Sequence, residues 1–302
     1  MANPIIEDIR LKIRSGNPIT RLIIINIAVF LVVSLLRILL FLTGNSTLFA
    51  GFVSTVIDNI SFPISIEELA FKPWTIITYM FTHIDIFHIL WNLITLYWFG
   101  QILADYTSTK KIIPLYLMGG VAGALVTLLL VTLVPVFHHY IGSPMVGASA
   151  GITAIIIAAA TLVPNYRLNL LFIGPVKLLY VALFVVFIDI LNVATYDNIG
   201  GNIAHLGGAL MGYIFIVQYK QGRDLSSWIN RFLNWLGSLF KASPKSKLNV
   251  AYKRAVSDGE YNYGKKITQA QIDGILDKIS KSGYESLSKA EKEILFKASN
   301  KK

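Results

Sequence analysis

Several apolar runs reach about 18 residues or more, and they constrain the fold of this chain more than any other feature. Crossing about 30 Å of hydrocarbon takes about 20 mainly apolar residues in a helix. Only 15% of the residues are charged, whereas an ordinary soluble domain carries about a quarter. We therefore expect an all-α, polytopic membrane protein.

The apolar runs predict six transmembrane helices. These are residues 21–43, 84–105, 112–136, 149–163, 174–194 and 200–218. The first run is too long for a signal-peptide core, and no small-residue cleavage site follows it, so we expect it to be retained. Lys and Arg occur before span 1, between spans 2 and 3, between spans 4 and 5 and after span 6, but not in loops 137–148 and 195–200. This bias predicts that both termini face the cytoplasm.

Outside the six spans, the composition divides the rest of the chain into further regions. We predict a cytosolic N-terminus at 1–20, a six-span domain at 21–220, an interfacial amphipathic helix at 221–241, a linker at 242–267 and a small soluble helical domain at 268–302. Trp228, Phe232 and Trp235 share one face of the amphipathic segment, which basic residues flank. Ser288 and Glu291 form a capping-box pattern in the last domain. The mixed segment 44–72 predicts a re-entrant or interfacial element.

Charge and cysteine content exclude several classes of function. Much of the net charge of +10 lies after Tyr219 and near helix ends, which fits membrane topology and attraction to anionic lipid better than nucleic-acid binding. The chain has no cysteine, so it has no disulfide, thiolate nucleophile or cysteine metal site. The histidines show no H-E-x-x-H pattern. We predict no metal, no cofactor and no nucleic-acid partner.

A few polar residues interrupt the apolar runs, and such residues are costly in lipid and usually functional. They are His88, Asn92, Ser149, Asp189, Asn192, Asn202 and His205. Asn92, Ser149 and His205 each lie 13 or 14 residues before the predicted cytoplasmic end of their spans. At about 1.5 Å per residue, all three lie about 20 Å above the cytoplasmic boundary.

The fourth span is too short to cross the bilayer, since 15 residues make a helix of about 22 Å. The chain must therefore descend to it through the non-helical residues 140–148, which is tolerated where backbone lines a wet cavity or is covered by protein. Ser149 would then lie at the positive end of a buried helix dipole.

A serine hydroxyl needs a base to act as a nucleophile, and His205 is the histidine at the depth of Ser149. Gly208 and Gly212, four residues apart, would let spans 4 and 6 approach closely. His88 and Asn92 share one helical face and could donate to an oxyanion together with the Ser149 N–H. The alternative is that the glycines serve packing alone and that Ser149 merely caps span 4.

Three motifs together resemble the rhomboid intramembrane serine proteases, of the bacterial type with a small C-terminal cytosolic helical domain. They are F-T-H-I-D-I-F-H-I-L-W-N at 81–92, G-A-S-A-G at 147–151 and A-H-L-G-G-A-L-M-G at 204–212. The resemblance covers about residues 65–220. It implies a six-helix core in the cell (inner) membrane and a serine endopeptidase that cleaves transmembrane protein substrates through an acyl-enzyme, with span 5 gating access.

The resemblance also implies a role for each matching residue. Ser149 would be the nucleophile and His205 the general base, without a third, acidic member. His88, Asn92 and the Ser149 N–H would form the oxyanion hole, and His83 would have a structural, hydrogen-bonding role. The motif glycines that would support this site are Gly147, Gly151, Gly208 and Gly212.

The sequence departs from the family pattern at three places. Ala150 replaces a common glycine, and we expect activity to survive because alanine is also small. Thr153 stands where an aromatic residue often packs against the histidine, so something else must orient His205, such as a hydrogen bond. Segment 44–72 lacks the Trp-Arg pair that stiffens this loop in some members.

Two other functions compete with a protease. A catalytically inactive rhomboid-like adaptor would bind membrane proteins, but the retained serine, histidines and asparagine argue against it. A transporter could use Asp189 in a proton path, yet the halves of the chain show no inverted repeat. Asp189 could instead pair with a polar neighbour inside the bundle.

Overall fold

The structure is a computed structural model, and it describes residues 16–171, 173–195, 198–240 and 258–299. The chain forms two compact units, Met1–Lys241 and Ala242–Lys302. Four helices of the first unit are long and apolar enough to cross a bilayer, namely α2 (Pro18–Leu42), α6 (Ile86–Tyr106), α7 (Ile112–Leu133, preceded by the 3-10 turn η2 at Thr109–Lys111) and α10 (Ile199–Lys220). Two further apolar helices are shorter, α8 (Ser149–Leu162) and α9 (Leu178–Ala194).

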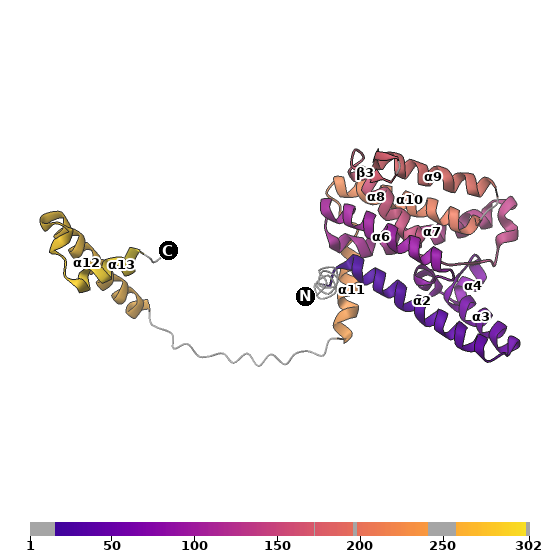
Figure 1. Cartoon of the computed structure of the whole chain (residues 1–302), viewed down its shortest axis with the longest axis horizontal. Coiled ribbons are helices and arrows are strands. Elements are labelled where there is room, and N and C mark those ends of the chain that lie inside the picture. Colours follow the sequence, from indigo (N-terminus) through magenta and orange to yellow (C-terminus); the bar gives the residue numbers. More distant parts are fainter. Residues whose placement is uncertain (1–15, 172, 196–197, 241–257, 300–302) are drawn as a thin grey trace. The chain divides into compact units, whose positions relative to one another are not determined.

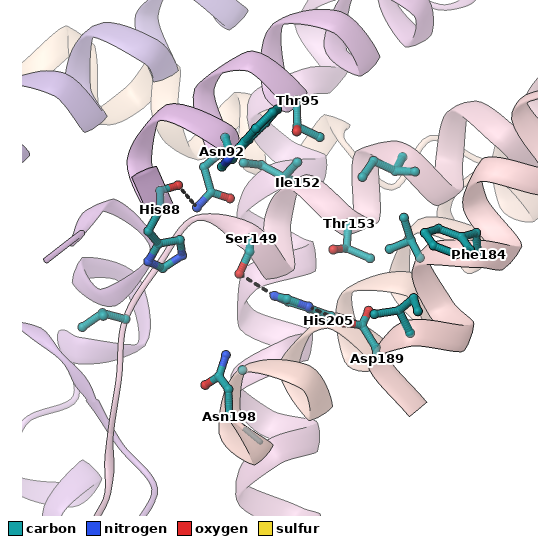
Figure 2. Close-up of a pocket in the computed structure, with 16 residues that line it drawn as sticks. His88, Asn92, Thr95, Ser149, Ile152, Thr153, Phe184, Asp189, Asn198 and His205 are labelled. Atoms are coloured by element: carbon teal, nitrogen blue, oxygen red, sulfur yellow. Dashed lines mark hydrogen bonds and ion pairs between the residues drawn. The ribbon is translucent and has the colours of Figure 1, made fainter. Parts of the chain in front are cut away.

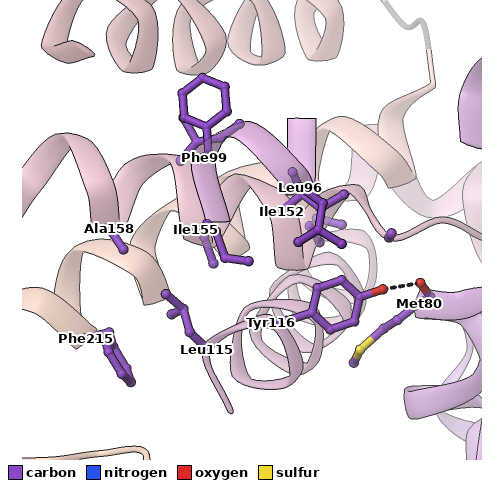
Figure 3. Packing of buried hydrophobic residues seen from close by; sticks show 14 of the residues in the cluster. Met80, Leu96, Phe99, Leu115, Tyr116, Ile152, Ile155, Ala158 and Phe215 are labelled. Carbon is purple, nitrogen blue, oxygen red and sulfur yellow. Dashed lines mark hydrogen bonds between the residues drawn. The ribbon is translucent and has the colours of Figure 1, made fainter. Parts of the chain in front are cut away.

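Helix α8 lies at the centre of the bundle and contacts α6, α7, α9 and α10 (Figure 1). Small residues such as Gly151 and Ala154 let the four neighbouring helices approach α8 closely, and ten of its 14 residues are buried. Around it, large side chains such as Leu96, Leu115 and Phe215 fill the core, and the Tyr116 hydroxyl donates to the Met80 carbonyl at 2.6 Å (Figure 3). The predicted short fourth span is thus a buried helix surrounded by longer ones.

The chain is mostly helical, as predicted, and the described residues also include two short antiparallel ladders that the prediction lacked. Strand β1 (Phe62–Pro63) pairs with β2 (Pro144–Met145), and β3 (Arg167–Leu170) pairs with β4 (Gly174–Lys177). The predicted fifth span, 174–194, therefore loses its first four residues to a hairpin. Gly174 adopts a φ of +88° there, and Pro175 cannot donate a backbone hydrogen bond.

Segment 44–72 and the entry to α6 fold into short elements. They are α3 (Ser46–Ile60), β1, α4 (Ile66–Phe71), α5 (Thr75–Thr78) and the 3-10 turn η1 (Tyr79–Phe81). The predicted third span, 112–136, ends earlier than expected, since α7 stops at Leu133 and the 3-10 turn η3 (Pro135–Tyr140) follows. Pro135 explains the stop, because the residue before a proline is disfavoured in a helix.

The chain after α10 forms α11 (Ser227–Phe240), α12 (Asp258–Ser282), the 3-10 turn η4 (Tyr284–Ser286) and α13 (Lys289–Ser299). The capping box is confirmed: the Ser288 N–H donates to Glu291 Oε2 at 2.7 Å, and the Glu291 N–H donates to the Ser288 hydroxyl at 3.4 Å. Helix α12 begins at Asp258, inside the segment that the composition predicted as linker. Two glycines and few apolar residues hide the helical pattern of residues 258–267.

Candidate active site

Ser149 is the first residue of α8, and the chain leading to it is fixed by backbone hydrogen bonds. The Gly147 N–H donates to the Tyr79 carbonyl at 2.9 Å, and the Ala148 N–H donates to His83 Nε2 at 3.3 Å. The pairing of Met145 with Phe62 holds the same segment one step earlier. The predicted non-helical descent to the serine is therefore an extended segment with defined partners.

Gly147 is required by both its conformation and its surroundings. Its φ of +125° is one that side-chain-bearing residues rarely adopt. A Cβ at this position would also lie 2.8 Å from Cε1 of the His88 ring. Glycine therefore lets the chain pass against His88 immediately before the serine.

Close contact between α8 and α10 brings Ser149 and His205 together. A Cβ added at Gly208 would collide with the carbonyl oxygen of Ala150, and one added at Gly212 would collide with that of Ala154. Glycine at both positions therefore allows the two backbones to touch, as in other small-residue helix pairs. His205 Nε2 lies 2.6 Å from the Ser149 hydroxyl, and a dashed line marks this contact in Figure 2.

The structure places an acidic residue where the family resemblance implied none. Asp189 on α9 lies on the other side of the His205 ring, with Oδ1 2.8 Å from Nδ1 (Figure 2). The residue is only 5% exposed, and its Oδ2 has no hydrogen-bond partner among the described residues. The sequence signal was an isolated acid within an apolar run, but the sequence did not identify its partner.

His83, His88 and Asn92 form a second polar group on the α6 side. The Asn92 side-chain amide donates to the His88 carbonyl at 2.9 Å, and its nitrogen lies 3.3 Å from His83 Nε2. The rings of His83 and His88 meet edge to face, with centroids 5.0 Å apart. His88 and Asn92 line the cavity that also contains Ser149, whereas His83 lies behind them and is buried.

These side chains surround one cavity of about 470 Å³ between α6, α8, α9 and α10. Ser149, His205 and Asp189 form one side, His88 and Asn92 another, and Phe184 with other α9 residues adds an apolar wall (Figure 2). Ser149 begins α8, where free backbone N–H groups and the helix dipole favour negative charge. The arrangement thus offers a hydroxyl, a base and donors around a space that admits a peptide segment.

Gly151 supports the site from the opposite face of α8. A Cβ at this position would lie 2.6 Å from the Tyr116 carbonyl oxygen, so glycine lets α7 approach α8. Ala150, the departure from the family pattern, is buried where α8 meets α7 and α10. Its Cβ would lie 2.8 Å from a Cβ added at Gly123. The structure therefore accommodates alanine here because Gly123 and Gly208 face it.

Comparison with known proteins gives two family matches along the chain. The family described as "Rhomboid domain" matches residues 70–221, and a family of unknown function, DUF6576, matches residues 257–301. The first match contains Ser149, His205, Asp189, His88 and Asn92. The second contains the described helices of the C-terminal unit.

Two curated proteins are similar to the chain over its central part. RHOMBOID-like protein 12, mitochondrial, of Arabidopsis thaliana is 32% identical over 166 residues, which cover 49% of this chain and 47% of that protein. Presenilin-associated rhomboid-like protein A, mitochondrial, of Danio rerio is 26% identical over 140 residues, covering 45% of this chain and 35% of that protein. The chain thus matches less than half the length of either relative.

Proposed function

The chain belongs to the rhomboid family and is a mostly helical, multi-span membrane protein, and from this premise we propose that it is an intramembrane serine endopeptidase. The observation that carries the proposal is the 2.6 Å separation between the Ser149 hydroxyl and His205 Nε2 inside a cavity. A hydroxyl hydrogen-bonded to an imidazole is the arrangement that nucleophilic catalysis needs.

The proposed reaction begins when Ser149 Oγ attacks the carbonyl carbon of the scissile peptide bond. His205 Nε2 takes the hydroxyl proton, and the carbonyl oxygen becomes an oxyanion. The Ser149 N–H, the Asn92 amide and His88 line the cavity as donors for that charge. The Asn92 amide nitrogen donates to the His88 carbonyl at 2.9 Å and lies 3.3 Å from His83 Nε2, and rotation of the whole side-chain amide would present it to the oxyanion.

The second half of the reaction returns the enzyme to its starting state. His205 gives its proton to the leaving amine as the C–N bond breaks, which leaves an acyl-enzyme on Ser149. A water molecule then attacks the ester while His205 takes one of its protons. Collapse of this second intermediate breaks the bond to Ser149 Oγ, which recovers its proton from His205, and releases the carboxylic acid product.

We propose transmembrane proteins as the substrates and the lipid bilayer as the working environment. Helix α9 lines one side of the cavity with apolar side chains, and family membership points to membrane proteins as a class. We further propose a cell (inner) membrane location with both termini cytoplasmic, from the distribution of Lys and Arg. The two relatives described above carry "mitochondrial" in their names.

Probe labelling tests the activity directly. A fluorophosphonate should modify the wild-type protein in detergent and spare Ser149→Ala and His205→Ala. Ser54→Ala is the control, because the exposed hydroxyl of Ser54 bonds a carbonyl of its own helix. The same variants should behave in parallel when single-span test proteins are offered as substrates. Labelling of Ser149→Ala at the wild-type level, or no labelling of folded wild type, would instead favour the inactive adaptor.

Topology can be tested separately, since the chain has no native cysteine. Lys110 and His139 are both exposed and lie on opposite sides of the membrane in the proposed topology, so Lys110→Cys and His139→Cys are suitable variants. In intact cells, a membrane-impermeant maleimide should modify the cysteine at 139 and spare that at 110. The reverse pattern would invert the proposed orientation.

A further inference from the structure

We propose that Asp189 is a positioning residue for His205, so that the site works as a Ser–His–Asp relay assembled from three helices. The inference rests on the proposed function, because it assumes that His205 is the base for Ser149. It departs from what the family resemblance implied, which was a serine and a histidine without an acid. The observation is the placement of Asp189 Oδ1 at 2.8 Å from His205 Nδ1.

The two hydrogen bonds at His205 define which nitrogen carries the proton. A neutral imidazole has one N–H and one lone pair. An ionised carboxylate only accepts, so at 2.8 Å from Asp189 the hydrogen belongs on Nδ1. Nε2 then carries the lone pair that accepts the Ser149 hydroxyl at 2.6 Å. Asp189 therefore selects the tautomer that general-base catalysis requires.

Asp189 also explains how the His205 ring is oriented, although Thr153 replaces the aromatic residue that often packs against this histidine in the family. Thr153 lies on α8 one turn after Ser149, is 4% exposed, and lines the same cavity. It is too small to hold an imidazole ring by stacking. Figure 2 shows Asp189 reaching the ring from α9, next to Thr153. A hydrogen bond from a neighbouring helix thus takes the place of an aromatic contact within α8.

The carboxylate also favours the charged form of His205 that exists during the reaction. When His205 takes the Ser149 proton, the imidazolium lies against an opposite charge in a poorly screened environment. Burying a lone carboxylate is costly, but two features offset that cost here: the Nδ1–H bond and the cavity that Asp189 lines.

The helix that carries Asp189 gives the proposal a structural consequence. Only Leu178, Ala182 and Asp189 are buried on α9, and the rest of the helix is partly or fully exposed. Among the described residues, the bond between Asp189 and His205 ties this sparsely buried helix to α10. A complete relay exists only while α9 lies against α10.

The test is the rate of Ser149 labelling as a function of pH in wild type, Asp189→Asn and Asp189→Glu. In Asp189→Asn we expect labelling to slow by about 100- to 10,000-fold, since replacing the acid of a serine-protease triad by its amide costs about 10,000-fold in kcat. The acidic limb should move to lower pH, because the imidazolium loses its neighbouring anion. Asp189→Glu keeps the charge and should restore the position of that limb, with a reduced rate.

The other groups around His205 remain in these variants, which isolates the effect. Ser149 faces it from α8, and His88 is the titratable neighbour on the α6 side. Helix α7 packs against the opposite side of α10 through Gly123 and Val126, which do not titrate. Asp105→Asn, at the exposed end of α6, is the matched control and should leave rate and profile unchanged.

The outcomes separate this inference from the proposed function. Wild-type protein that is folded but never labelled would overturn both. Labelling of Asp189→Asn within about twofold of wild type would overturn the inference alone. The inference would also be overturned if the Asp189→Asn rate fell only in proportion to the folded fraction, measured by thermal unfolding, and the pH profile did not move. That result would mean that Asp189 only stabilises the fold.

Discussion

Helices α8 and α9 both flank α10 at the site, but they are held in different ways. Helix α8 touches α10 backbone to backbone through Gly208 and Gly212, and most of its residues are buried. Helix α9 buries three residues and turns bulky side chains such as Tyr180, Leu183 and Phe187 outward. In a bilayer, small residues belong between helices and large apolar ones can face lipid at no cost.

The difference assigns separate tasks to the two contacts. The α8–α10 contact fixes the distance between Ser149 and His205, because two backbones in contact cannot slide without collision. The α9–α10 contact adds Asp189, which tunes His205 through a single hydrogen bond. Substitutions in the first contact should therefore remove the site, whereas substitutions in the second should weaken it in steps.

The largest expected effect is at the α8–α10 contact. Gly208→Val should abolish Ser149 labelling and lower the unfolding temperature, because its side chain meets the Ala150 carbonyl, which cannot move aside. Overpacking typically costs about 1–3 kcal/mol, and a misplacement of about 1 Å costs about 100-fold in rate before any loss of fold.

Gly237 on α11 provides the control for this change. A Cβ at that position has no atom within 4 Å, so Gly237→Val should leave labelling unaltered. If Gly208→Val were labelled as fast as wild type and Gly237→Val, the contact between α8 and α10 would not be tight. The contrast between the α8–α10 and α9–α10 contacts would then fail.

Asn92 lies on the α6 side of the cavity, and its loss should cost less than Gly208→Val. Asn92→Ala should reduce kcat by about 100- to 1,000-fold, the usual cost of one oxyanion donor. Thr95→Val, one turn along α6 on the same cavity, is the control and should change kcat little. Turnover of a single-span test protein is the measurement. An unchanged turnover in Asn92→Ala would remove that residue from the site.

The loosely held side can be examined by a pair of adjacent substitutions on α9. Ala182→Leu adds volume at a position only 4% exposed and should cost about 1–3 kcal/mol, while labelling slows as Asp189 moves away. Leu183→Ala, at a position 56% exposed, should change stability by no more than about 0.5 kcal/mol. Equal effects of the two, in thermal unfolding and in labelling, would mean that α9 is held more evenly than its burial indicates.

The sequence allowed Ser149 and His205 to be predicted as partners because the relevant signals are local. Isolated polar residues in apolar runs mark the depth, and Gly208 and Gly212 mark the face that must touch another helix. The short α8 followed from counting residues. These features depend on helical rise and on side-chain volume, and both can be read from the sequence of a single segment.

Asp189 could not be assigned from the sequence because its role depends on the rotation of α9. Ala182 and Asp189, seven residues apart, are weak signs of the buried face in an otherwise bulky apolar helix, and neither identifies His205 as the partner. The hairpin of β3 and β4 escaped prediction for a related reason, since its apolar residues continue the run of α9. Tertiary packing decides both.

The smallest expected effect lies in the C-terminal unit, which extends the comparison from packing to charge. Lys278 hydrogen-bonds Glu291, and with the Ser288 N–H and hydroxyl it lowers the pKa of that carboxyl from 4.5 to about 2. The resulting stabilisation is fully present above the unfolded pKa of about 4.5 and is lost as the pH falls toward 2. Between pH 5 and pH 2, the protection factors of α13 amides in the full chain, which correct exchange for its intrinsic pH dependence, should fall. Glu291→Gln should give lower protection at pH 5 and lose this acid dependence. Because Glu291 lies in the other unit from the Gly208 and Gly212 contacts, protection in α8 should be the same in Glu291→Gln as in wild type. If Glu291→Gln lowered protection in both α8 and α13, the two regions would not be stabilised independently, and the comparison between them would be wrong.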